Sequence, residues 1–155
     1  MLDLPGYVAS LAQRVATTGA DVVVPRIEYT RGALSAQLFV DGELPGSGIP
    51  RTSMIHVVER WSRSYLDRPW RLDEYAYELL DHERDLRIAF HLHDAEWFVA
   101  NHRVVVHEHC ERPIGVSRCQ HYAGTPIAGG FEALDRLMAA WVSDSVEDCS
   151  LRTCL

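Results

Sequence analysis

Apolar and polar residues recur with two different periods along this chain of 155 residues. Apolar residues at helical spacing predict one amphipathic helix over residues 4–18 and another over residues 131–141. Between them, alternating apolar and polar residues predict strands at residues 21–29, 33–40, 54–61, 72–80, 86–93 and 103–109. The Gly- and Pro-rich residues 41–50 predict a loop. We therefore expect an α+β fold in which a largely antiparallel sheet of about five or six strands is flanked by N-terminal and C-terminal helices.

Length and composition indicate a single domain over residues 1–142, followed by acidic residues 143–155 that we expect to form a flexible tail. No segment approaches the roughly 20 apolar residues that a membrane-spanning helix needs, and residues 1–6 lack the pattern of an export signal. The four cysteines are too few for a disulfide scaffold in a chain of this length and fit a reducing compartment better. These features predict a cytoplasmic protein without a membrane partner, and they leave the oligomeric state open.

The net charge of −7 argues against non-specific binding of nucleic acids. Residues 51–71 have a different local composition, because arginines interleave there with aromatic residues. Arginine side chains bind phosphate and aromatic rings stack on bases, so this segment suits single-stranded RNA. The alternative is a solvated strand and loop with partly buried aromatic rings. The candidate RNA-binding residues are Arg60, Arg63, Arg68, Arg71, Trp61 and Trp70.

Two His-x-His pairs carry the most concentrated chemistry of the chain. Side chains alternate along a strand, so each pair places two imidazoles on one face, roughly 6.5 to 7 Å apart at the backbone. If the two strands are antiparallel neighbours, all four rings meet in one patch, joined by an acidic or thiol side chain from the end of the second strand. The residues concerned are His91, His93, His107 and His109, with Glu108, Cys110 or Glu111 beside them.

Three interpretations of these histidines stay open. In the first, one neutral and one protonated ring cleave RNA by acid–base catalysis without a metal, and Arg87 stabilises the charged phosphorane. In the second, the four histidines, with Asp94 or Glu111, bind zinc or iron in a metal-dependent enzyme. In the third, the histidines are ordinary surface or hydrogen-bonded residues of a non-enzymatic binding or scaffold module.

The order of motifs over residues 54–142 resembles that of the TumE-type toxin family of bacterial toxin–antitoxin systems. The resemblance rests on the tyrosine-rich strand 75–79, the strand 90–94 that ends in Asp, the His-x-His element 107–109 and the terminal helix. It implies an RNA-cleaving toxin that an antitoxin protein neutralises, with His107 and His109 at the matching motif and Asp94 at the matching acid. With the tyrosine-rich strand included, the candidate catalytic residues are His107, His109, His93, His91, Asp94, Arg87 and Tyr77.

Overall fold

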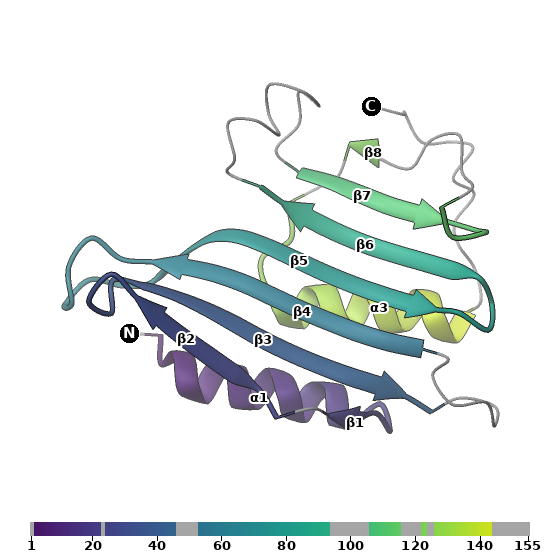
Figure 1. Ribbon diagram of the computed structural model, residues 1–155, viewed down its shortest axis with the longest axis horizontal. Helices are drawn as coiled ribbons and strands as arrows, with labels where there is room; N and C mark the ends of the chain where they lie inside the picture. Colours follow the sequence, from purple (N-terminus) through teal and green to yellow (C-terminus); the bar gives the residue numbers. More distant parts are fainter. Residues whose placement is uncertain are drawn as a thin grey trace.

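Alternation of apolar and polar side chains gives the sheet of this protein one apolar face, which two helices cover (Figure 1). The computed structural model describes residues 2–22, 24–45, 53–93, 106–115, 122–123 and 126–143. All neighbouring strands are antiparallel, in the order β1-β3-β4-β5-β6-β7-β8, with β2 also paired to β3. The strands are β1 (Asp21–Val22), β2 (Arg26–Thr30), β3 (Ser35–Leu44), β4 (Ser53–Ser62), β5 (Arg71–Asp81), β6 (Leu86–Leu92), β7 (Val106–Glu111) and β8 (Tyr122–Ala123).

The helices come from opposite ends of the chain, as the apolar spacing predicts. α1 (Leu4–Ala16) begins at Asp3, whose side chain accepts a hydrogen bond from the backbone N–H of Gly6. α3 (Gly130–Ser143) packs against the same face of the sheet. The expected α+β fold is confirmed, and the predicted five or six strands correspond to the six that have five or more residues. Apart from Ser143, the predicted tail lies outside the described residues.

The predicted loop at residues 41–50 is wrong for its first part, because β3 continues to Leu44. The glycine that suggested a loop has a packing role instead. A Cβ atom built on Gly42 would lie 2.6 Å from Cγ1 of Val15. Glycine therefore lets α1 approach the strand closely without ending it.

Apolar side chains from both helices and the central strands form the core between the helices and the sheet. On β5, Tyr75, Tyr77 and Leu79 are buried there, while the residues between them lie on the other face. Further fully buried members are Leu4, Leu11, Val15, Leu38, Ile55, Val57, Leu86, Leu134 and Leu137. The opposite face of the sheet is consequently left without a covering helix among the described residues.

A buried carboxyl group connects the core to both helices. Glu59 on β4 has no exposed surface and accepts hydrogen bonds from the Tyr77 hydroxyl (2.7 Å), the Tyr7 hydroxyl (2.8 Å) and Nε1 of Trp61 (2.8 Å). The backbone N–H of Gly130, at the start of α3, donates to the same side chain over 3.1 Å. Because an unpartnered buried charge is costly, this set of donors fixes the positions of α1, α3 and the sheet relative to one another.

Two other sequence-based expectations concern membrane-spanning helices and the oxidation state of the cysteines. Among the described residues, no helix is long and apolar enough to cross a bilayer. Cys110, the one cysteine in the described part of the chain, is disulfide-bonded. This finding contradicts the expectation of reduced cysteines, which rested on their number alone.

Candidate histidine site

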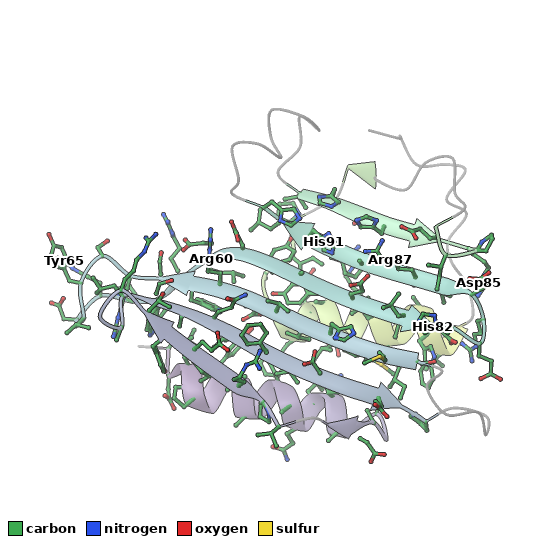
Figure 2. The ribbon with its side chains drawn as sticks, in the orientation of Figure 1. Arg60, Tyr65, His82, Asp85, Arg87 and His91 are labelled. Carbon is green, nitrogen blue, oxygen red and sulfur yellow. The ribbon has the colours of Figure 1, made fainter. Side chains whose placement is uncertain are left out.

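The two His-x-His pairs lie opposite each other on neighbouring strands. β6 and β7 are antiparallel, with His91 facing His107 and Ala89 facing His109. Ring centroids 4.9 to 5.4 Å apart connect all four imidazoles. The predicted convergence of the pairs on one face is therefore confirmed. This face is the one turned away from the helices, on which Figure 2 shows His91 and Arg87 along β6.

Three of the four rings bring nitrogen atoms together at one point. Nδ1 of His91 lies 3.1 Å from Nε2 of His107, and one ring nitrogen from each of His91, His107 and His109 lies within 4.8 Å of the others. Two nitrogens bound to one tetrahedral zinc ion at about 2.0 to 2.1 Å would stand about 3.3 Å apart. His107 and His109 are 1% and 5% exposed. The His91–His107 pair thus stands at the separation that one zinc ion requires, and the trio as a whole is a group that could hold a metal ion.

Glu111 orients the His109 ring. Oε1 of Glu111 lies 3.1 Å from Nδ1 of His109 and accepts a hydrogen bond from Nη1 of Arg87 over 2.9 Å. An ionised carboxylate only accepts, so its contact with Nδ1 requires a proton on that nitrogen. Arg87 Nη1 lies 3.2 Å from the same nitrogen but also only donates, so it forms no hydrogen bond with a protonated Nδ1. We therefore assign the proton of the His109 ring to Nδ1, donating to Glu111, which places the lone pair on Nε2.

The Arg87 guanidinium is fixed between two strands. Its Nε donates to Glu78 on β5, while Nη1 reaches Glu111 on β7. Burial lowers the pKa of Arg87, but the hydrogen bonds that Arg87 donates to Glu78 and Glu111, together with their negative charges, more than offset that effect, so the net shift of the pKa is upward. Arg87 is thus a permanent cation whose positive charge both neighbouring carboxylates balance.

Burial disfavours the protonated forms of His91 and His93. Burial, followed by the proximity of His109, His107, His93 and Arg87, lowers the pKa of His91 to about 2. Burial also lowers the pKa of His93, with Glu74 opposing it. His91 is consequently a neutral imidazole at neutral pH, which is the form that binds metals.

Glu111, in contrast, is held in its charged form. Burial acts to raise the pKa of its carboxyl group, but a hydrogen bond from the backbone N–H of Gly115 (3.0 Å), together with His109 and Arg87, lowers it overall. Both carboxylate oxygens therefore have donors inside the protein. Glu111 acts as a partner of the histidine ring.

The other residues predicted to join the histidine cluster do not lie on its face of the sheet where the structure describes them. Glu108 and Cys110 alternate with the histidines along β7 and lie on the helix-covered face, where Glu108 accepts a hydrogen bond from Arg136 of α3 over 3.2 Å. Tyr77 also lies on that face, bound to Glu59, so the structure does not bring it to the histidines. Asp94 lies outside the described residues.

The candidate RNA-binding residues do not form one surface. Trp61 is buried against the helices and donates to Glu59, so its ring is not available for stacking on a base. Arg60 lies on the face of the histidines and pairs with Glu74. Arg60 and Glu74 line a small cleft of about 90 Å³ together with His93.

The other basic and aromatic candidates lie in the β4–β5 connection and at the first residue of β5. Arg63 stacks on Trp70, with its guanidinium carbon 4.3 Å from the ring centroid, and donates to two backbone carbonyls. Arg68 is exposed in the β4–β5 connection. Arg71 pairs with Asp73 at 2.8 Å. Of these residues, Arg63 and Arg71 line a second, larger cleft, together with residues outside the predicted segment such as Arg31 and Ser35.

Sequence reasoning missed two groups of polar residues. Glu78 was not identified as a partner of Arg87, although both are charged residues at alternating positions of neighbouring strands. Arg31 was not connected with Arg71, because they are separated along the chain and only the strand register brings them together. Comparison of the chain with protein-family models, with curated proteins and with solved structures finds no match. The resemblance to TumE-type toxins therefore stays a prediction.

Proposed function

We propose that His91, His107 and His109 bind one divalent transition-metal ion, and that the protein is a metal-dependent hydrolase. The observation that carries this proposal is the convergence of three ring nitrogens within 4.8 Å of one another on one face of the sheet. Three imidazole ligands leave a coordination position for water or substrate, which is the arrangement of catalytic zinc sites. Zinc is therefore the metal that the site suits best.

The donor set favours zinc over the alternative of iron bound by two histidines and a carboxylate. Glu111 is a carboxylate in contact with His109, and its oxygens already accept hydrogen bonds from Arg87, His109 and Gly115. A carboxylate that holds a histidine by its second ring nitrogen is the usual outer partner of a zinc ligand. In this proposal Glu111 orients His109 and does not bind the metal.

Metal-free acid–base catalysis has weaker support from the same residues. That mechanism needs a ring that is protonated near neutral pH beside a neutral one. Burial and neighbouring positive charge disfavour the protonated form of His91, and His107 and His109 are almost fully buried. A bound metal activates water without requiring any of the three rings to gain a proton.

RNA cleavage without a metal remains the second candidate function, as the resemblance to TumE-type toxins implies. One structural observation favours an RNA substrate. Glu108, the acidic residue between His107 and His109, lies on the opposite face and pairs with Arg136, so its carboxylate does not face a phosphodiester bound at the histidines. In this second proposal the partner is an antitoxin whose basic segment covers an acidic protein.

An activity assay with and without metal separates the two candidates. We would follow hydrolysis of single-stranded RNA and of an activated phosphodiester by the full chain as purified, after chelation, and after zinc is restored. Loss of activity on chelation and its recovery with zinc support the metal-dependent hydrolase. Activity that is indifferent to chelation supports the second candidate. If neither substrate is cleaved under any of these conditions, the protein is not a hydrolase of phosphodiesters by either mechanism.

A further inference from the structure

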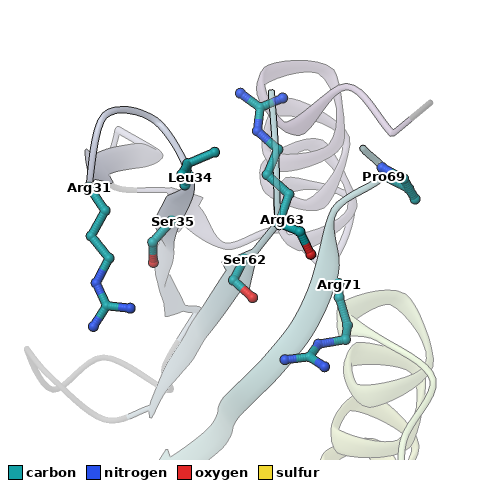
Figure 3. Close-up of a pocket in the computed structure, with 8 residues that line it drawn as sticks. Arg31, Leu34, Ser35, Ser62, Arg63, Pro69 and Arg71 are labelled. Carbon is teal, nitrogen blue, oxygen red and sulfur yellow. The ribbon is translucent and has the colours of Figure 1, made fainter. Parts of the chain in front are cut away.

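A cleft of about 350 Å³ lies at the end of the sheet that carries the β2–β3 turn and the β4–β5 connection. Its lining residues are Arg31, Leu34, Ser35, Ser62, Arg63, Ser64, Pro69 and Arg71. The strand register places Ser35 opposite Ser62, and Ser62 opposite Arg71. Figure 3 shows the result, in which the hydroxyl groups of Ser35 and Ser62 lie between the guanidinium groups of Arg31 and Arg71.

The cleft is positively charged in a protein whose net charge is −7. Among the described residues, no carboxylate forms an ion pair with Arg31 or with Arg63. Arg71 does pair with Asp73, through Nε (2.9 Å) and Nη2 (2.8 Å), but 78% of its side chain is exposed. A guanidinium has five N–H donors, so Asp73 leaves most of those of Arg71 available to a second acceptor.

Arg63 shapes the cleft and does not point into it. In Figure 3 its guanidinium lies on the far side from Arg31 and Arg71. Nε of Arg63 donates to the carbonyl oxygen of Ala33 over 3.1 Å, and Nη1 donates to that of Leu66 over 2.8 Å. These bonds connect the β2–β3 turn to the β4–β5 connection. Arg31 in the turn and Arg71 after the connection therefore belong to segments that are hydrogen-bonded to each other.

We propose that this cleft binds an oxyanion of the phosphate type, held by Arg31 and Arg71 from two sides and by the hydroxyl groups of Ser35 and Ser62 between them. Guanidinium groups form paired, charge-assisted hydrogen bonds with phosphate oxygens, and hydroxyl groups add donors without adding bulk. The phosphate belongs either to a small phosphomonoester or to the backbone of single-stranded RNA. The proposal is independent of metal binding at the histidines.

The test uses the full chain, dialysed free of metal, at low ionic strength because these groups are exposed to salt screening. Binding of inorganic phosphate and of a short oligouridylate is followed by NMR, with sodium chloride as the control for ionic strength. The variants are Arg31→Gln and Arg71→Gln. The matched control is Arg26→Gln, which removes an exposed arginine of β2 that does not line the cleft.

We expect saturable binding at one site, with resonance shifts at Ser35 and Ser62. Loss of one charged donor weakens binding about tenfold or more in each cleft variant, whereas the control stays within about twofold of the parent. Saturation by inorganic phosphate identifies a phosphomonoester site, and saturation by the oligonucleotide alone identifies a backbone phosphate. If neither probe saturates the folded protein, or if Arg26→Gln weakens binding as much as the cleft variants, the proposal is overturned.

Discussion

Nδ1 of His91 lies 3.1 Å from Nε2 of His107, across the neighbouring strands β6 and β7. Without a metal, one of these nitrogens carries a proton and the two form an N–H···N hydrogen bond. In a metal site both would present lone pairs to the ion, so binding must break this hydrogen bond and move the proton to the other nitrogen of its ring.

The first prediction follows from that exchange. In metal-free protein, ¹⁵N NMR of the imidazoles should show one protonated and one unprotonated nitrogen within this pair. One equivalent of zinc should shift both nitrogens to values typical of metal-bound imidazole, and leave the exposed ring of His82 unchanged. If the His91 and His107 signals do not respond to zinc, the two rings are a structural hydrogen-bonded pair.

The second prediction concerns Glu111, which accepts a hydrogen bond from His109. Glu111→Gln removes the charge that fixes the ring, while nearly preserving the size of the side chain. We expect zinc affinity to fall by about 10- to 100-fold, as for other outer partners of metal-bound histidines. A competition titration with a chromophoric chelator measures the change, with the exposed Glu28→Gln as control. Unchanged affinity would show that Glu111 does not support a metal ligand.

The third prediction is a pH dependence of stability in metal-free protein. The pKa of His91 is about 2 when folded and about 6.5 in the unfolded chain, so the unfolded state binds the additional proton below about pH 6.5. The free energy of unfolding should therefore fall as the pH decreases from about 6.5, by up to about 1.4 kcal/mol per pH unit from this group. Urea unfolding between about pH 6.5 and 5 should show a shallower dependence for His91→Gln. Identical slopes for the variant and the parent would contradict the assigned burial of His91.

The fourth prediction tests the assignment of Tyr77 to the core. Tyr77→Phe removes the 2.7 Å hydrogen bond to Glu59 and should lower the free energy of unfolding by about 1.5 to 3 kcal/mol. Tyr29→Phe, in which the parent ring is about half exposed, should change it by no more than about 0.5 kcal/mol. Denaturant unfolding measures both. A Tyr77→Phe variant that keeps the parent stability but loses activity would contradict the structural role and support a catalytic one.

The sequence alone predicted the elements of the sheet and the pairing of the histidines, because both depend on local alternation. It did not predict the register between neighbouring strands, which decides which of their side chains lie on the same face of the sheet. Tyr77 was grouped with the histidines, yet the register aligns His91 with Ala76 and turns Tyr77 to the core. The same register, extended over several strands, brings Arg31 and Arg71 to one cleft. Such relationships depend on hydrogen bonds between strands distant in the chain, which no local pattern specifies.

The central claim is that three histidines form one metal site. The most direct measurement is titration of metal-free protein with Co²⁺, whose visible absorption reports the number and geometry of its ligands, beside the variants His107→Gln and His82→Gln. Circular dichroism confirms that each variant is folded. We expect the parent and His82→Gln to bind one equivalent with tetrahedral or five-coordinate absorption, and His107→Gln to lose that absorption. A parent that binds no Co²⁺, or a folded His107→Gln variant that binds it as the parent does, would contradict the assignment of the histidine cluster as a metal centre.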